Sequence, residues 1–288
     1  MHRKKVLIHS LIVWQDGTAG LYLLKPLVFH SLKSISFSPW IDHETLKAFT
    51  QLSPHLKHLT MQMTPSKHSP RLNNATQPHL DIATLSILVT GDYRNPFSAC
   101  PSTPSIFPQL THLHLDIDIS ERASGKFVQS FLSTTSRSLQ YLFLGWTPFE
   151  IPVQSAVVPD LGKFYLDLSH FTNLRALQMS FCERQENTPQ VAGTVSSCQN
   201  LPALRSVILL RPPGDSSRAD HKSWGGLDLK FSDSAEGYFP SLKEVVVRSP
   251  MMSLFPTCLA KGLIRPAEPK FSLKKRWLSS RAVAYEDI

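Results

Sequence analysis

The sequence predicts an α/β fold, an irregular solenoid with a parallel concave sheet, about eight repeats, few convex helices and several loops. The first observation is a motif of three apolar residues, at offsets zero, three and five, that occurs eight times between Leu32 and Val247. The second observation is the period, because successive motifs begin 24 to 38 residues apart. Units of this length cannot bury their apolar residues alone and must stack on their neighbours.

Each motif predicts one short strand of the sheet. The motifs begin at Leu32, Leu56, Ile82, Leu110, Leu139, Leu174, Leu204 and Leu242. Offsets three and five point to one face of such a strand, and offsets two, four and six point to the other. Burial of three apolar side chains contributes on the order of 5 kcal/mol per repeat. The motif and period are typical of leucine-rich repeats, so we expect Leu113, Leu142 and Leu177 on adjacent rungs of one hydrophobic spine.

The segments between the motifs differ in character. Apolar residues recur at helical spacing in residues 42–52, which Asp42 can cap, in residues 127–132 and, more weakly, in residues 191–198. Proline, serine, asparagine or glycine dominate residues 65–78, 96–108 and 212–237. The first group predicts convex helices, and the second predicts irregular surface loops.

Three parts are predicted along the chain: an N-terminal cap segment in residues 1–31, a leucine-rich-repeat solenoid in residues 32–250, and a basic C-terminal cap or tail in residues 251–288. Near the N-terminus, an apolar run from Val6 to Trp14 follows basic residues and is similar to a secretory signal. His9 and Ser10 interrupt this run, which is also too short to cross a bilayer. We therefore expect a half-buried first strand that covers the open end of the stack.

The formal net charge of +8 is concentrated at the two ends of the chain. Residues 1–31 contribute +3, residues 251–288 contribute +4, and the repeat region between them contributes only +1. The scaffold itself is therefore nearly neutral, unlike a nucleic-acid-binding stripe. The tail from Lys270 to Arg281 combines basic residues with Phe271 and Trp277. Two interpretations stay open for it: a nucleic-acid or nuclear-import segment, and a partly helical cap whose lysines keep it soluble.

The cysteine pattern bears on the compartment. Four cysteines are present, at positions 100, 182, 198 and 258, with no C-x-x-C pair and no crowded framework. Neither a zinc ribbon nor a disulfide scaffold is indicated. We expect a reducing intracellular compartment, cytoplasmic or nuclear.

Two runs, Leu174 to Cys182 and Phe239 to Val245, resemble the repeat region of F-box proteins, most closely the irregular fungal type. The resemblance covers roughly residues 27–250. Repeats of this kind place an asparagine or cysteine eight residues after the first leucine, and only Cys182 fits that position here. The resemblance therefore implies an uneven, distorted arc.

The same resemblance implies a function. Proteins of this family grip the adaptor of a cullin-type ubiquitin ligase with a helical F-box module, while their repeats hold the protein to be modified. The 31 residues before Leu32 leave too little chain for that module. The resemblance thus implies a substrate-receptor arm, with a ubiquitin-ligase adaptor as a partner only if an F-box lies upstream.

Side chains at offsets two and four form the concave surface, where solenoids usually bind their partners. Tyr141 and Phe143, flanked by His112 and His114, are expected to be exposed there and resemble the rigid anchors of protein interfaces. The alternative is that a terminal segment or a loop folds over them. The candidate protein-binding residues are His58, His112, His114, Tyr141, Phe143, Gln178, Ile208 and Glu244.

Two other patterns have both an ordinary and a functional interpretation. One strand face carries four possible metal ligands, His112, His114, Asp116 and Asp118. Residues on the same side of a strand stand about 6.6 Å apart, so a metal would need a further ligand from a neighbouring strand. We therefore predict a polar stripe and no metal. Basic residues occupy offset one in five of the eight repeats. They are Lys33, Lys57, Arg175, Arg205 and Lys243. This row could touch an acidic partner or simply keep the strand ends solvated.

The sequence contains no glycine-rich phosphate loop, G-x-S-x-G elbow, H-E-x-x-H pair or kinase signature. We therefore predict a non-enzymatic protein-interaction scaffold without a cofactor, whose concave face binds a protein ligand of unknown identity and which makes no membrane contact. The alternative function is nucleic-acid association through the basic termini. A hydrolase hypothesis rests only on the stripe from His112 to Asp118.

Overall fold

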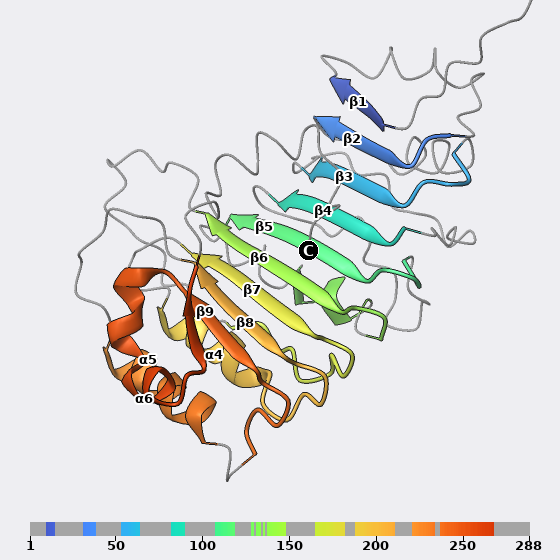
Figure 1. The fold of residues 1–288 in the computed structure, drawn as a ribbon. Coiled ribbons are helices and arrows are strands. Elements are labelled where there is room, and N and C mark those ends of the chain that lie inside the picture. Colours follow the sequence, from blue (N-terminus) through green and yellow to red (C-terminus); the bar gives the residue numbers. More distant parts are fainter. Residues whose placement is uncertain are drawn as a thin grey trace, which may run out of the picture.

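A computed structural model of the protein describes residues 10–14, 31–38, 53–63, 82–89, 107–118, 128–129, 131–133, 135, 137–147, 165–181, 188–210, 221–233 and 237–267. Its main element is one open sheet of ten strands, whose order in space is their order in the chain (Figure 1). Every strand is parallel to its neighbours. The α/β class and the parallel sheet predicted from the sequence are therefore confirmed.

The strands coincide with the motifs, with one additional strand at each end. They are β1 (Ser10–Trp14), β2 (Ser34–Ser38), β3 (His58–Met63), β4 (Thr84–Val89), β5 (His112–Asp118), β6 (Tyr141–Thr147), β7 (Ala176–Phe181), β8 (Ser206–Leu210), β9 (Glu244–Val247) and β10 (Ile264–Pro266). Strand β1 pairs with β2, as expected of a first strand at the end of the stack. Strand β10 follows the last motif and is an addition that the sequence pattern does not mark.

Apolar residues at offset three lie side by side on neighbouring strands. Leu113 pairs with Leu142, and Leu142 pairs with Leu177. Their exposed fractions are 2%, 1% and 0%. The prediction that these leucines occupy adjacent rungs of one spine is confirmed. The first apolar residues of the motifs, from Leu32 to Leu204, belong to the same buried cluster.

The residue before each of strands β2 to β8 has a backbone carbonyl that accepts two N–H donors from the next repeat. The Thr111 oxygen, for example, accepts hydrogen bonds from the backbone nitrogens of Gln140 and Tyr141, each at 2.9 Å. The same pair of bonds occurs at the other offset-one residues Lys33, Lys57, Ala83, Gln140, Arg175 and Arg205. These bonds hold neighbouring strands in the same register, so equivalent side chains form rows across the sheet.

Helices α4 (Thr188–Ser197) and α5 (His221–Ser232) lie beside the C-terminal strands (Figure 1). Residues Val191 and Val195 of α4, with Cys198 just after it, are fully buried in the main core, which confirms the helix predicted from their spacing. No helix in the described ranges has the length and apolar character needed to cross a bilayer.

Other predicted connections have different outcomes. Val128, Phe131 and Leu132 are helical and buried, as their spacing predicts. The helix predicted over residues 42–52 and the loop over 65–78 lie outside the described residues, as does the loop over 96–108 up to residue 106.

The prediction of an irregular loop over residues 212–237 is wrong for its centre, which forms α5. Trp224, Leu227 and Phe231 recur at helical spacing and are 2%, 1% and 4% exposed. The Trp224 ring lies 5.6 Å from that of Phe181 and 5.8 Å from that of Phe255. Gly225 and Gly226 oppose the helix by roughly 1 kcal/mol each, whereas burial contributes about 1.5–3 kcal/mol per large apolar side chain. Tertiary burial therefore outweighs the local preference.

Regular structure continues beyond the last motif. A 3-10 helix, η2 (Ser249–Leu254), leads into α6 (Pro256–Ala260) and then β10. The Asp228 carboxylate of α5 holds the start of α6, because its Oδ2 accepts a hydrogen bond from the Thr257 N–H (2.9 Å) and its Oδ1 one from the Cys258 N–H (2.8 Å). The described part of the predicted C-terminal cap, residues 251–267, thus joins the same core and sheet.

Candidate functional site

The outward face of the sheet consists of the side chains that alternate with the buried ones. We define it as two rows across β2 to β9, at motif offsets two and four. The first row is Ser34, His58, Thr84, His112, Tyr141, Ala176, Ser206 and Glu244, and the second is Ser36, Thr60, Ser86, His114, Phe143, Gln178, Ile208 and Val246. All the protein-binding candidates predicted from the sequence lie in these two rows.

Exposure along the outward face is uneven. His112 is exposed, whereas the remaining candidates are half-buried: His58, His114, Tyr141, Phe143, Gln178, Ile208 and Glu244. Tyr141 and Phe143 are therefore less exposed than their offsets suggest. The reason is local, because each of these rings packs against a histidine ring of the neighbouring strand.

Two ring pairs link β5 to β6. His112 and Tyr141 are register partners, and their rings stack with centroids 4.4 Å apart at an interplanar angle of 14°. His114 and Phe143 are also register partners, and their rings meet edge to face at 4.1 Å and 88°. We call these four residues the ring patch. The Tyr141 and Phe143 side chains are held by these ring contacts, so they lose little conformational entropy when a partner binds.

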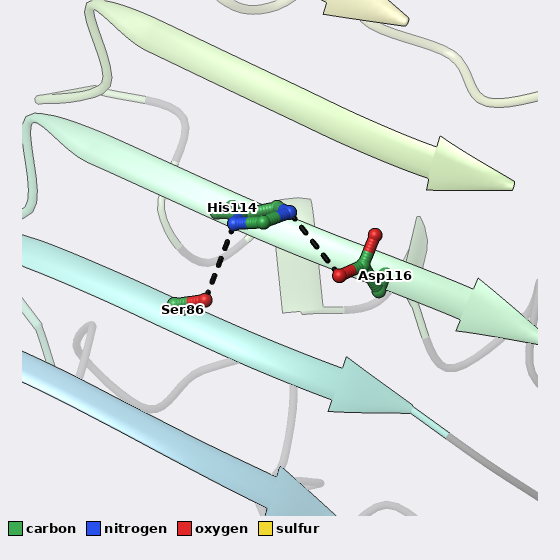
Figure 2. A network of polar contacts seen from close by, with 3 residues as sticks. All are labelled: Ser86, His114 and Asp116. Carbon is green, nitrogen blue, oxygen red and sulfur yellow. Dashed lines mark hydrogen bonds and ion pairs between the residues drawn. The ribbon is translucent and has the colours of Figure 1, made fainter. Parts of the chain in front are cut away.

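The His114 imidazole also joins polar groups on two strands (Figure 2). Its Nδ1 lies 3.3 Å from the Ser86 Oγ on β4, within hydrogen-bond distance. Its Nε2 lies 3.3 Å from the Asp116 Oδ2 on β5 and is shielded from solvent. The second contact is a close polar contact and not an aligned hydrogen bond. The ring of His114 is thus fixed from three sides, by Ser86, Asp116 and Phe143.

Asp116 occupies its position because Gly145 has no side chain. The two residues are register partners, and Asp116 is 9% exposed. A glycine in the interior of a strand marks a close approach of another group. The signal available in the sequence was an aspartate at offset six in one repeat and a glycine at the same offset in the next. Sequence reasoning named Asp116 as part of a polar stripe and missed this contact.

Electrostatics favour neutral imidazoles at the polar end of the face. Burial lowers the pKa of His58. Burial also lowers the pKa of His112, and the nearby His58 lowers it further. Both rings therefore favour the uncharged form at neutral pH, in which one ring nitrogen donates and the other accepts a hydrogen bond. For His112, Nδ1 lies 2.9 Å from the Thr111 Oγ1.

Three predicted binding residues, Gln178, Ile208 and Glu244, lie on β7 to β9 and do not belong to the ring patch. Gln178 and Ile208 continue the second row on β7 and β8. Glu244 on β9 forms an ion pair with Arg265 on β10, with Nη1 and Oε2 3.6 Å apart. This pair depends on β10, which the motif does not mark, so the sequence did not reveal it.

The polar stripe on β5 does not assemble a metal site in the described part of the chain. There, no group of three or more histidine, cysteine, aspartate or glutamate side chains is placed to hold an ion. The two described cysteines, Cys198 and Cys258, are free and buried. Burial raises the pKa of the Cys198 thiol to about 12, which keeps it protonated and unreactive. The basic segment from Lys270 to Arg281 lies outside the described residues.

The Ser86, His114 and Asp116 contacts unite the residue types of a hydrolytic triad. Hydrolysis also needs N–H donors that are free to stabilise an oxyanion. These residues stand on β4 and β5, in the interior of a hydrogen-bonded sheet, where backbone N–H groups pair neighbouring strands. These contacts fix the position of the His114 ring on the outward face of the sheet. In comparisons with known proteins, no family model and no curated protein matches the chain.

Proposed function

We propose that this protein is a non-enzymatic interaction scaffold of the leucine-rich-repeat type, which binds a protein ligand on the outward face of its sheet. The main observation in support of this proposal is the ring patch, in which Tyr141 stacks on His112 and Phe143 packs on His114. Rigid, half-buried aromatic rings beside polar rims are the residues that dominate protein interfaces. Support for the repeat assignment comes from the in-register rows of Leu113, Leu142 and Leu177.

The sequence resemblance extends this proposal. By that resemblance, the protein acts inside the cell as the target-binding arm of an F-box type ubiquitin-ligase receptor, and a ubiquitin-ligase adaptor joins it through an F-box supplied upstream. The bound target is the unknown protein ligand of the outward face.

The affinity of such a face is expected to depend on few side chains. Truncation of an interface anchor costs about 2 kcal/mol or more, which corresponds to roughly thirtyfold in the dissociation constant. Replacing Tyr141 and Phe143 by alanine removes both anchors and leaves the inward leucines untouched. Gln178 and Ile208 are expected to contribute less, because neither belongs to the ring patch.

The test is affinity capture with the tagged full chain, followed by quantitative mass spectrometry. The matched control is Leu229→Ala, which removes a 63% exposed side chain on α5, outside the outward face. We expect proteins that are retained by both the wild type and the control to be depleted with Tyr141→Ala/Phe143→Ala, while circular dichroism shows that all three proteins are folded. An unchanged set of captured proteins would show that the ring patch is not the binding surface.

A further inference from the structure

A row of exposed basic residues lies just before strands β6 to β9 begin, along one edge of the sheet. We call Arg137, Arg175, Arg205 and Lys243 the basic rim, and all four are exposed. Arg175, Arg205 and Lys243 occupy offset one in three consecutive repeats. Their backbones are directly hydrogen-bonded, because the Arg205 nitrogen donates to the Arg175 oxygen and the Lys243 nitrogen to the Arg205 oxygen, each at 2.8 Å. The Cα atoms of neighbouring members of this series are therefore about one strand spacing, roughly 4.8 Å, apart.

The turns that carry the rim are tied to one another. Asn173, two residues before Arg175, donates from its Nδ2 to the Arg137 carbonyl oxygen at 2.7 Å. Ser241, two residues before Lys243, donates from its Oγ to the Pro202 carbonyl oxygen at 2.6 Å. These bonds hold the turns before β6 and β7, and those before β8 and β9, in fixed relation, so the four cations stand on a rigid support.

The fold does not require a cation at offset one. The structural task of that position is to provide the carbonyl that accepts two N–H groups, and Ala83, Thr111 and Gln140 perform it with uncharged side chains. Adjacent like charges repel one another, so a series of three is unfavourable for the isolated sheet. The backbone task of offset one therefore does not account for a basic residue in three consecutive repeats.

The charge of the rim is not neutralised within the described segments. There, no carboxylate forms an ion pair with Arg175, Arg205 or Lys243. The nearest acidic residue in sequence is Glu244, which pairs with Arg265 at 3.6 Å on the far side of β9. As far as the described residues go, Arg175, Arg205 and Lys243 are thus cations on consecutive strands without a paired carboxylate.

We propose that the basic rim binds an acidic polypeptide segment, rich in aspartate or glutamate, that lies across the starts of β6 to β9. Each of the three arginine guanidinium groups of the rim can take a carboxylate through two parallel hydrogen bonds. The rim starts close to the ring patch along the chain, because the Arg175 nitrogen donates to the carbonyl oxygen of Gln140, the residue before Tyr141. One partner can therefore place an apolar anchor on the ring patch and acidic residues on the rim.

A polypeptide fits this surface better than a nucleic acid. Proteins that bind nucleic acid neutralise many phosphates, typically along a strongly basic face, whereas the repeat region has a net charge of only +1. A neighbouring aromatic ring could serve as a platform for bases, but one side of the Tyr141 ring is already stacked on His112. Three cations on consecutive strands, with Arg137 on a turn tied to the first of them, match a short acidic segment.

The test uses the full chain and a fluorescein-labelled decaglutamate peptide, with decaglutamine as the neutral reference, followed by fluorescence anisotropy at low ionic strength. The variant is Arg175→Gln/Arg205→Gln/Lys243→Gln. The matched control, Lys270→Gln/Lys274→Gln/Lys275→Gln, removes the same number of charges from the C-terminal segment. We expect decaglutamate to bind the rim variant about tenfold more weakly than the wild type and the control variant within about twofold of it.

Several results would overturn the proposal. They are equal weakening by the rim and control variants, unchanged binding by the rim variant, and a labelled oligothymidylate that binds the rim more tightly than decaglutamate does. The single change Arg205→Glu provides a second test if the triple variant does not fold, since it should weaken binding on its own. Rim binding that persists in Tyr141→Ala/Phe143→Ala separates this inference from the proposed function of the ring patch.

Discussion

The Asp116 carboxylate lies where Gly145 on the next strand would carry a side chain. A Cβ added at Gly145 would stand 1.8 Å from the Asp116 Oδ1 and 3.0 Å from its Cγ. The same carboxylate reaches the His114 Nε2 with its other oxygen, at 3.3 Å. The absence of a side chain at Gly145 on β6 therefore determines how Asp116 of β5 is oriented beside the ring patch.

Gly145→Ala is expected to destabilise the protein by about 1–3 kcal/mol, because the Asp116 side chain must leave its place and lose its contact with His114. The matched control is Gly226→Ala in α5, where an added Cβ meets no atom of another described residue within 4 Å. That change should stabilise the protein by about 0.5–1 kcal/mol through the higher helix propensity of alanine. Urea unfolding followed by circular dichroism measures both free energies of unfolding.

The same pair offers a double-mutant cycle. If the clash with Asp116 is the cause, Gly145→Ala should cost much less in an Asp116→Ala background than in the wild type. Equal costs in the two backgrounds would show that the glycine is needed for another reason.

Asp228→Asn is expected to lower stability at neutral pH by about 1–3 kcal/mol, because a charged acceptor for two backbone N–H groups is lost. Burial acts to raise the pKa of Asp228, but the hydrogen bonds from Cys258 and Thr257 together outweigh it and leave the pKa lowered. A carboxyl group with a lowered pKa in the folded state stabilises the fold above its unfolded pKa, and this contribution is lost as the pH falls through the folded value. The difference between wild type and variant should therefore shrink below about pH 4. A pH-independent difference in urea midpoints would contradict this.

The stability of the protein is expected to fall as the pH is lowered below about 6.5, the ordinary pKa of histidine. The pKa values of His58 and His112 are both lowered in the folded protein, so the unfolded chain binds more protons in this range and is favoured by acid. Melting temperatures between neutral pH and a mildly acidic pH measure the effect. The variant His58→Gln/His112→Gln should show a flatter pH dependence, and an equally steep one would exclude these two residues as its origin.

Leu142→Ala is expected to cost about 2–5 kcal/mol, since it opens a cavity between Leu113 and Leu177 in the centre of the spine. Leu142 is 1% exposed, whereas Leu229, the matched control, is 63% exposed. Leu229→Ala should change the free energy of unfolding by less than about 0.5 kcal/mol. A small effect at Leu142 would contradict a shared core that runs from strand to strand.

The tertiary structure decided several features that depend on contacts distant in the chain. The composition of residues 212–237 favours a loop. The segment around Trp224 is nevertheless helical, because the Trp224 ring packs against Phe181 and Phe255. Strand β10 carries no motif. It pairs with β9 after α6, whose start is bound by the Asp228 carboxylate of α5. No local pattern contains these partners.

The sequence by itself determined the period, the class of fold and the face on which each strand residue lies. Apolar burial has a period of two along a strand, so the motif alone assigns Leu113 to the core and His112 to the outward face. It could not determine that His112 stacks flat on Tyr141 while His114 meets Phe143 edge-on. That difference, and the space above Gly145 that Asp116 fills, arise only when neighbouring strands are in register, because ring orientation and close approach are properties of a pair of strands and not of either one.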